Sequence, residues 1–187
     1  MGIYDLIKKT VHRQDSFLIM IEKMKSKPNP LIVETGCART PNNFGGDGMS
    51  TLIWDNYIEE YNGTCYSIDL SEQSIEFARN NTKHVNLICS DSVAYLFNLN
   101  KEFRQTNRYI DLLYLDSFDF QPHNPHPSSF HHILELLCIW PSCSKGTIIS
   151  VDDNFPNGIG KGKYVRQFLD NIGIKPIYNG YQIVWEL

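Results

Sequence analysis

Two stretches of the sequence decide the fold: Ile110-Asp111-Leu112-Leu113-Tyr114-Leu115-Asp116 and Thr147-Ile148-Ile149-Ser150-Val151-Asp152-Asp153. Each is a mainly apolar run that ends abruptly in carboxylates. Such a run is typical of a strand that is buried on both faces of a parallel sheet. Ligands of open α/β sheets bind outside the carboxyl ends of these strands. We therefore expect two central strands whose terminal carboxylates border a binding site.

The acidic ends of these runs also predict a metal site. If the strands are neighbours, the side chains of Asp116, Asp152 and Asp153 converge. Crowded carboxylates repel one another and resist ionisation unless a cation joins them. Mg²⁺ prefers oxygen ligands of this kind together with waters. We predict that the three aspartates bind Mg²⁺ or a similar divalent cation; the alternative is that Asp152 and Asp153 only begin a turn after the strand.

The composition argues against several classes of protein. A chain of 187 residues is long enough for one domain with a sizeable core. The formal net charge of −4 and the absence of charge runs do not indicate a nucleic-acid surface. No apolar run approaches the length of a membrane span, and no signal segment is recognisable. The five cysteines form no C-x-x-C pair. We expect a cytoplasmic protein with reduced thiols that binds neither nucleic acid nor membrane.

Strand-like and helix-like segments alternate after a helical extension at 1–28, within one predicted domain, 1–187. The second helical piece of the extension has Asp15 or Ser16 as its expected cap. The alternation predicts βαβ units and a mainly parallel sheet. The last two strands are separated by Asn179-Gly180, a two-residue hairpin signal, so the final strand should be antiparallel. The expected strands are 31–35, 64–69, 85–89, 110–116, 145–151, about 174–178 and 181–186; the expected helices are 49–61, 71–81, 91–99, 128–140 and 160–172.

Glycines and polar residues follow the first strand. The strand runs into Gly36 and a long loop, and Ser50-Thr51 then opens a helix. Glycine lets the backbone approach a ligand closely, and a helix N-terminus offers free N–H groups. The glycine spacing is not G-x-G-x-x-G, so the dinucleotide fingerprint is absent.

Acids follow the second and third strands as well. Asp69 ends the second strand, where an acid commonly binds the hydroxyl pair of a ribose. Asp91-Ser92 follows the third strand, and Asp91 either caps the next helix or accepts a hydrogen bond from an exocyclic amine. Acidic groups thus lie at the ends of the first five strands, which chance placement rarely produces.

These residues resemble a known family. Glu34-Thr35-Gly36, Asp69, Asp91-Ser92, Asp116 and the terminal hairpin are similar to class I S-adenosylmethionine-dependent methyltransferases, over about residues 30–187. The resemblance implies an α/β fold with a Rossmann-like, doubly wound seven-stranded sheet. The strand order would be 3-2-1-4-5-7-6, with strand seven antiparallel and helices on both faces.

The resemblance also implies roles for individual residues in binding S-adenosylmethionine. Glu34 would face the methionine amino group, and Gly36 would make room for the methionine part. Asp69 would bind the ribose hydroxyls, and Asp91 with Ser92 would recognise the adenine. Asp116 would be a further cofactor-binding residue. The family's compact E/D-x-G-x-G-x-G turn is replaced here by an insertion before Gly45, so Ser50 and Thr51 are expected to supply methionine contacts.

Within this family, Asp116 with Asp152-Asp153 is similar to metal-dependent O-methyltransferases such as catechol O-methyltransferase and the macrocin-type sugar enzymes. The resemblance implies methylation of a small hydroxylated molecule or a sugar. Two adjacent hydroxyls would replace waters on Mg²⁺, which lowers the hydroxyl pKa and aligns the oxygen with the sulfonium methyl group. The alternatives are a protein that binds the cofactor without turnover or acts without metal, and a nucleotide-sugar-binding Rossmann-type module.

The loop after Asp116 offers candidates for the base that removes the hydroxyl proton. Asp119 lies three residues further on. The nearby histidines do not have the spacing of a zinc site. They are either solvated or helix-capping, or one of them is a base or a substrate contact. His123 and His132 are the candidates, and either His131 or His132 could face the cleft. Separately, the amphipathic N-terminal helix allows a homodimer.

One glycine-rich segment does not fit a known motif. Gly158-Ile159-Gly160-Lys161-Gly162-Lys163 resembles a phosphate loop, but Tyr164 takes the position that the motif gives to Ser or Thr. We expect this segment to lead the chain into the following helix, or to contact an anionic group of the substrate.

Overall fold

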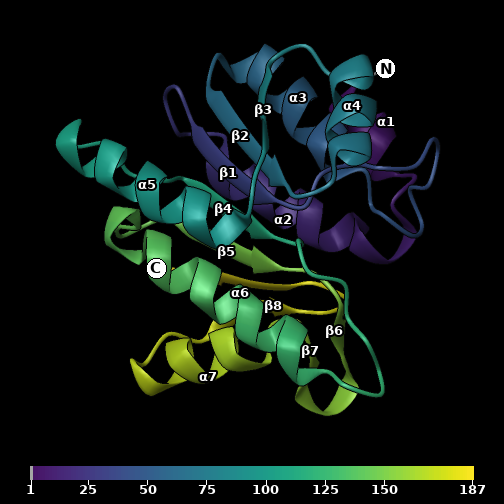
Figure 1. Cartoon of the computed structure of the whole chain (residues 1–187). Helices are drawn as coiled ribbons and strands as arrows, with labels where there is room; N and C mark the ends of the chain where they lie inside the picture. The colour runs from purple at the N-terminus through teal and green to yellow at the C-terminus, as the bar shows by residue number, and fades with distance from the viewer. Residues whose placement is uncertain (1) are drawn as a thin grey trace.

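A seven-stranded sheet forms the centre of the molecule (Figure 1). The computed structural model describes residues 2–187, apart from the side chain of Asn157. The sheet order is β3-β2-β1-β4-β5-β9-β8; β9 runs antiparallel to both neighbours and the other pairs are parallel. This confirms the predicted order and direction of all seven strands. Their bounds are β1 Leu31–Thr35, β2 Thr64–Asp69, β3 Val85–Cys89, β4 Leu112–Leu115, β5 Ile148–Val151, β8 Pro176–Asn179 and β9 Ile183–Glu186.

Helices cover both faces of the sheet, as predicted. In Figure 1, α1, α3 and α4 lie above the sheet and α5, α6 and α7 lie below it. The helices are α1 Ile3–Ile7, α2 Gln14–Met24, α3 Ser50–Tyr61, α4 Glu72–Asn81, α5 Ser92–Gln105, α6 His126–Ile139 and α7 Lys163–Asn171. Short 3-10 turns lie at Val11–Arg13, Trp140–Ser142 and Pro156–Gly158, and a small hairpin joins β6 Asn154–Phe155 to β7 Ile159–Gly160.

The central strands have no exposed face, which explains their apolar sequences. All four residues of β4 and of β5 are buried. Along β4, Leu112 and Tyr114 pack into the core on the α3 side, whereas Leu113 and Leu115 pack into the core on the α5–α6 side. A strand enclosed in this way needs apolar residues at successive positions rather than at alternate ones.

The N-terminal extension packs on the sheet. Phe17, Met20, Ile21 and Met24 of α2 are at most 1% exposed and share a core cluster with α3. The apolar face that suggested a homodimer is therefore covered within the chain. Over residues 2–187, no helix combines the length and the apolar character needed to cross a membrane.

Two local predictions are wrong. Helix α2 begins after Arg13 without a side-chain cap, so neither Asp15 nor Ser16 caps it. The Ser16 hydroxyl instead donates to the side chain of Gln182 at 2.5 Å. The last hairpin pairs Asn179 with Ile183, so its loop is 180–182 rather than the two residues Asn179-Gly180.

Candidate active site

Strands β1, β2, β4 and β5 end level with one another. The register pairs Thr35 with both Ile68 and Leu115, and it pairs Leu115 with Val151. The residues one position further along are Gly36, Asp69, Asp116 and Asp152. The sequence prediction that acids gather at one edge of the sheet is thus confirmed by the geometry of the backbone.

Three hollows follow one another along this edge. The first, of about 110 Å³, is lined by Asp69 and Asp91 among others. The central hollow, of about 40 Å³, is lined by Asp69, Asp116 and Asp153 among others. The third, which we call the apolar hollow, has about 520 Å³ and is lined by Asp153 and by apolar residues such as Phe155. Because Asp69 and Asp153 are each shared by two hollows, the three form one row.

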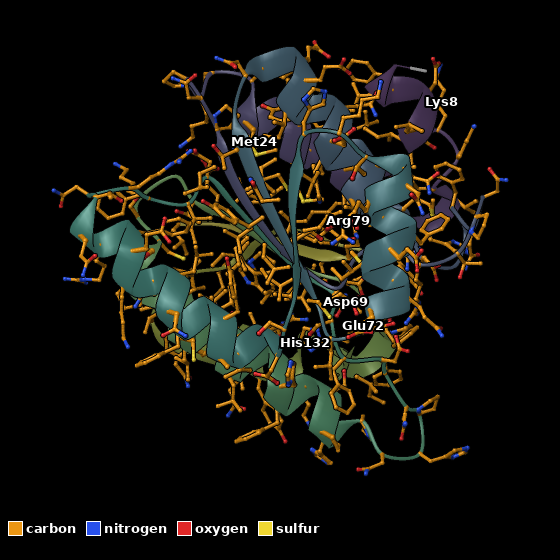
Figure 2. All side chains as sticks on the ribbon, turned by 45° about the horizontal axis from the view of Figure 1, so that its top comes forward. Lys8, Met24, Asp69, Glu72, Arg79 and His132 are labelled. Atoms are coloured by element: carbon orange, nitrogen blue, oxygen red, sulfur yellow. The ribbon has the colours of Figure 1, made fainter. Side chains whose placement is uncertain are left out.

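Asp69 separates the first hollow from the central one. Its carboxylate accepts hydrogen bonds from the backbone N–H groups of Cys37 at 3.0 Å and Ser71 at 2.7 Å. Both donors are neutral, so the negative charge of Asp69 is not compensated by a cation. A carboxylate has about four acceptor positions, so further hydrogen bonds to ligand hydroxyls remain available. Figure 2 shows Asp69 close to Glu72, where α4 begins.

Asp91 and Ser92 lie at the other side of the first hollow. Asp91 caps α5, because its Oδ1 accepts a hydrogen bond from the backbone N–H of Ala94 at 2.8 Å. The Ser92 hydroxyl lies 2.9 Å from Nε2 of His131. Asp91, Ser92 and His131 all line the first hollow. The structure therefore gives Asp91 the capping role. Of the two histidines that could face the cleft, it places His131, and not His132, in the lining of this hollow.

Glu34 is buried beneath the central hollow. Its Oε2 accepts hydrogen bonds from the hydroxyls of Thr51, at 2.7 Å, and of Ser67. Its Oε1 has no partner among the described residues. Burial raises the pKa of Glu34 to about 7. An unpaired buried acceptor costs about 1–3 kcal/mol, so a ligand that brought a donor to Oε1 would gain binding energy.

The residues between β1 and α3 have unequal roles. Gly36 has φ +80°, and a Cβ there would lie 2.3 Å from the carbonyl oxygen of Asp116. The glycine therefore makes room for the neighbouring strand, beyond the room for a ligand that the resemblance implies. Ser50 lines the central hollow. Thr51 is fully buried and accepts a hydrogen bond from the backbone of Ala38 at 2.9 Å, so it fixes the loop.

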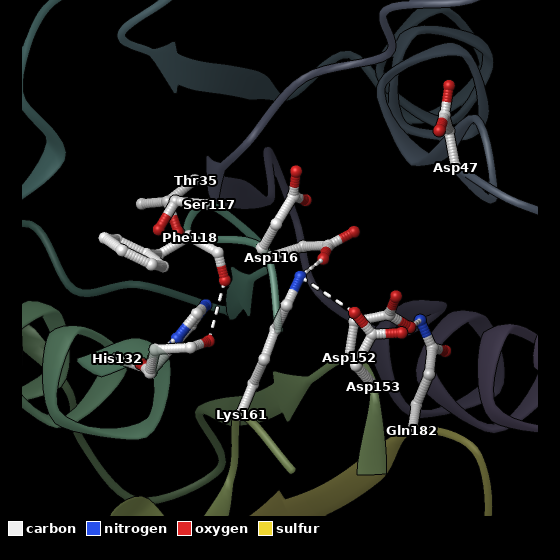
Figure 3. Close-up of polar contacts among 12 residues, drawn as sticks. Thr35, Asp47, Asp116, Ser117, Phe118, His132, Asp152, Asp153, Lys161 and Gln182 are labelled. Carbon is white, nitrogen blue, oxygen red and sulfur yellow. Dashed lines mark hydrogen bonds and ion pairs between the residues drawn. The ribbon is translucent and has the colours of Figure 1, made fainter. Parts of the chain in front are cut away.

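The three predicted metal ligands converge, and two of them bind a lysine. One carboxylate oxygen from each of Asp116, Asp152 and Asp153 lies within 4.8 Å of the others. The ammonium group of Lys161 lies 2.5 Å from Oδ1 of Asp116 and 3.1 Å from Oδ2 of Asp153 (Figure 3). Burial would lower the pKa of Lys161, but these carboxylates outweigh it and keep the pKa above its ordinary value. The lysine therefore carries a permanent positive charge.

The β6–β7 hairpin brings Lys161 to this position. Gly160 has φ +145°, and a Cβ at Gly160 would lie 2.2 Å from the carbonyl oxygen of Asp153. The chain passes so close to the end of β5 that the backbone N–H of Lys161 donates to Asp153 at 3.2 Å. The glycines that resemble a phosphate loop thus allow a tight return of the chain beneath the acidic cluster.

A second cation reaches the cluster from the N-terminal extension. Arg13 donates from Nε and Nη2 to the two oxygens of Asp152, at 2.8 and 2.7 Å, and both side chains are almost fully buried. Gln182 also donates to Asp152, at 2.9 Å. The Arg13 guanidinium lies 4.5 Å from the ring centroid of Tyr181. Such a bidentate, desolvated pair fixes Asp152 in one orientation.

This arrangement does not fit a divalent ion as the side chains lie. A shared ion would need open carboxylate oxygens, yet Asp152 is occupied by Arg13 and Gln182. The other two aspartates bind Lys161. An ion among the three would lie directly beside the lysine ammonium and would be repelled by it. The predicted Mg²⁺ therefore requires that Lys161 move away.

Asp119 borders the central hollow on the loop after β4. Its two oxygens accept hydrogen bonds from Arg39 at 3.0 and 3.1 Å. Both side chains are largely exposed. The pair connects the loop after β1 to the loop after β4, and so it bridges the central hollow. The role of Asp119 as the base stays a prediction.

The two predicted catalytic histidines lie elsewhere. His123 is exposed in the loop before α6 and borders none of the three hollows. His132 lies on α6 (Figure 2) and is fully buried; its Nδ1–H donates to the carbonyl oxygen of Ser128 at 2.7 Å. Burial lowers the pKa of His132 to about 4. A neutral histidine enclosed in this way has no access to a ligand, so we do not assign a catalytic role to His123 or His132.

The comparisons with known proteins identify the fold. No protein-family model matches the chain, and no curated protein matches it in sequence. Among solved structures, MycE methyltransferase from the mycinamycin biosynthetic pathway, in complex with Mg, SAH and mycinamycin VI, has a TM-score of 0.66 at 11% identity. The match covers all of this chain, which spans only 53% of the MycE chain.

A second similar structure is apo CalS11, a TDP-rhamnose 3′-O-methyltransferase from calicheamicin biosynthesis. Its TM-score is 0.61 at 14% identity, over 93% of this chain and 80% of that one. At such low identities the likeness shows the fold alone. The chain has the Rossmann-like fold of class I S-adenosylmethionine-dependent methyltransferases, as its sequence predicts.

Proposed function

We propose that the protein transfers a methyl group from S-adenosylmethionine to a hydroxyl group of a small molecule or sugar. The observation that supports this most directly is the row of three hollows joined by Asp69 and Asp153. A transfer reaction needs a donor site and an acceptor site that meet at one point, and the central hollow lies between two such sites. Similar structures include a sugar O-methyltransferase and a methyltransferase bound to SAH.

The first and central hollows suit the cofactor. Asp69 would accept hydrogen bonds from the ribose hydroxyls, since its own donors are neutral. Asp91 and Ser92 would border the adenine, with His131 behind Ser92. Ser50 and Glu34 would bind the amino group of the methionine part, because Oε1 of Glu34 lacks a donor. S-adenosylmethionine, when bound, would supply a methyl group on a positively charged sulfur.

The apolar hollow suits the acceptor. Among the described residues, its apolar walls are Phe120, Pro122, Phe155, Pro156 and Ile159, and the charged residue that lines it is Asp153. The rings of Phe120 and Phe155 lie 4.9 Å apart. A ring-shaped acceptor would pack against this pair of rings and direct a hydroxyl group towards Asp153 and the central hollow. Asp119 would take the hydroxyl proton there.

A divalent ion remains the alternative form of this proposal. Asp116, Asp152 and Asp153 would then bind Mg²⁺ after Lys161 had moved away, and the ion would lower the pKa of the acceptor hydroxyl. The residues as they lie do not favour this form.

Calorimetric titration with S-adenosylhomocysteine tests the cofactor part. Binding at one site is expected, and the absence of binding would refute the proposal. A methyl-transfer assay with labelled S-adenosylmethionine and a panel of hydroxylated acceptors then tests the reaction. Asp119→Asn should lower kcat by about 10²–10⁴-fold, the usual effect of losing a general base, whereas Asp170→Asn on α7 should not. Binding without transfer to any acceptor would favour a protein that binds the cofactor without turnover.

A further inference from the structure

The acidic cluster at the ends of β4 and β5 contains its own cation. Lys161 reaches both Asp116 and Asp153 with its ammonium group, and its side chain is only 2% exposed. Burying an ammonium group is costly unless it is paired with an opposite charge, so most lysines keep their ammonium group in water. The burial of Lys161 therefore needs a cause, and the carboxylates supply it.

We propose that the ammonium group of Lys161 takes the place predicted for the divalent ion and binds the acceptor oxygen during methyl transfer. This inference rests on the proposed function and names a further residue of that site. It makes the reaction independent of divalent metal.

The hydrogen-bonding capacity of the lysine supports this role. An ammonium group has three N–H donors. Two of them point to Asp116 and Asp153 (Figure 3), and within residues 2–187 no partner is found for the third. Lys161 lines the central hollow, and its partner Asp153 also lines the apolar hollow. The ammonium group thus lies beside the point where the proposed donor and acceptor sites would meet.

The charge balance of the cluster supports it too. Lys161 and Arg13 supply two positive charges beside three carboxyl groups, so the cluster carries at most one net negative charge. A divalent ion added to this group would make the cluster positive, close to a sulfonium that is itself positive. With the lysine alone, the cluster does not become positive, and it still offers one N–H to the acceptor oxygen.

The reaction can be written for this arrangement. The acceptor hydroxyl gives its proton to Asp119, and the N–H of Lys161 stabilises the negative charge that develops on the oxygen. A lone pair of this oxygen forms the new C–O bond to the methyl carbon. The C–S bond breaks, and its electron pair stays on the sulfur. Lys161 keeps its own proton throughout.

A lysine and a metal ion differ in the acceptors that they select. A metal ion binds two adjacent hydroxyls by exchanging two waters, whereas a single free N–H binds one oxygen. We therefore expect acceptors with an isolated hydroxyl to be methylated as efficiently, in kcat/KM, as acceptors with two adjacent hydroxyls.

The first test measures metal binding directly, with Mn²⁺ as the probe. The wild-type protein and the variants Lys161→Met and Lys161→Arg are titrated with Mn²⁺ by calorimetry, and their Tm is measured with and without Mg²⁺. We expect no Mn²⁺ site in the wild type or in Lys161→Arg. In Lys161→Met the carboxylates have lost their cation, so this variant should bind Mn²⁺ and be stabilised by Mg²⁺. Stoichiometric Mn²⁺ binding by the wild type would overturn the inference, and this outcome can be read even if Lys161→Met does not fold. A Lys161→Met variant that folds but has no Mn²⁺ site would also overturn it.

The second test uses the methyl-transfer assay. A chelator should leave kcat of the wild type unchanged, whereas Lys161→Met should lower kcat by about 10²–10³-fold, as expected for one lost donor to the reacting oxygen, with partial recovery in Mg²⁺. Loss of wild-type activity on chelation, restored by Mg²⁺, would contradict the inference and leave the proposed function intact. If S-adenosylhomocysteine did not bind, the proposed function would fail, and the Mn²⁺ titration would still decide whether Lys161 fills the metal position.

Discussion

The carboxylates at the two halves of the sheet edge are bound by opposite kinds of partner. After β2 and β3, the donors found for Asp69 and Asp91 among the described residues are neutral backbone N–H groups. After β4 and β5, the aspartates bind the charged side chains of Lys161 and Arg13. We refer to these regions as the neutral half and the cation half.

This difference separates two uses of the same residue type. In the neutral half the carboxylate charge is uncompensated, so it is available to a ligand's hydroxyl and amine donors. In the cation half the charge is already paired, so the cluster serves as a preorganised electrostatic surface rather than as an open metal site. Acids at strand ends therefore indicate a site, but their partners decide what the site binds.

The largest effect is expected in the cation half, for Asp152→Ala. This change leaves the buried guanidinium of Arg13 without its carboxylate, and breaking a buried pair in this way costs about 3–5 kcal/mol. Urea unfolding at neutral pH measures the loss. The double variant Arg13→Met, Asp152→Leu removes both charges and should lose much less. An equal loss in the single and double variants would contradict the account of this pair.

A pH effect is expected at Glu34, on β1 between the two halves. Burial raises its pKa from 4.5 to about 7 in the folded protein, so between these pH values the unfolded chain releases the proton that the folded protein retains. Stability should therefore fall as pH rises from 4.5 to about 7. The loss from this group should be about 3 kcal/mol, because a tenfold difference in proton affinity corresponds to about 1.4 kcal/mol.

Glu34→Gln removes this titration. The variant should gain stability relative to the wild type as pH rises through the same window, and the difference should be constant above it. Urea unfolding of both proteins across the pH range checks this, with Glu76→Gln on the exposed face of α4 as the control. If the difference between Glu34→Gln and the wild type did not change with pH, the buried, protonated state of Glu34 would be refuted.

A smaller effect is expected for Asp69→Asn in the neutral half. The amide retains the size of the side chain but loses the charge that strengthens hydrogen bonds to ribose hydroxyls, worth about 1.5–3 kcal/mol. The Kd for S-adenosylhomocysteine should rise by about 10–100-fold, measured by calorimetry, with little change in Tm. Asp170→Asn on α7 is the control. If the affinity for S-adenosylhomocysteine did not change, the ribose would not bind at Asp69.

The smallest effect on stability is expected for Arg39→Ala. The side chains of Arg39 and Asp119 are 47% and 62% exposed, and such exposed pairs contribute less than about 1 kcal/mol. The pair nevertheless bridges the loops over the central hollow. Stopped-flow measurement should show faster association and dissociation of S-adenosylhomocysteine in Arg39→Ala. A loss of stability as large as that of Asp152→Ala would mean that this bridge belongs with the buried pairs.

The sequence was sufficient for the sheet and for most of its acidic edge. Runs such as 110–116 are apolar at successive positions because β4 is enclosed on both faces. This pattern can be recognised from the local sequence alone. Asp69 and Asp116 are recognisable because each lies at the end of a strand, so the position of the strand fixes the position of the acid.

The partners of these acids could not be predicted, because they come from distant segments. Arg13 lies 139 residues before Asp152, and Lys161 lies 45 residues after Asp116. The one local signal for Lys161 was its place between Gly160 and Gly162, which marks a tight approach of the backbone. The burial of His132 depends on the rotation of α6 about its axis, which the nearby histidines and prolines do not reveal.

A crystal structure grown with S-adenosylhomocysteine and MnCl₂ tests the contrast between the two halves most directly. Anomalous scattering at the manganese edge locates any bound ion without ambiguity. We predict the nucleoside beside Asp69 and Asp91, the ammonium group of Lys161 between Asp116 and Asp153, and no manganese peak at the cluster. A manganese ion among Asp116, Asp152 and Asp153 with Lys161 turned away, or a nucleoside bound elsewhere, would contradict this account.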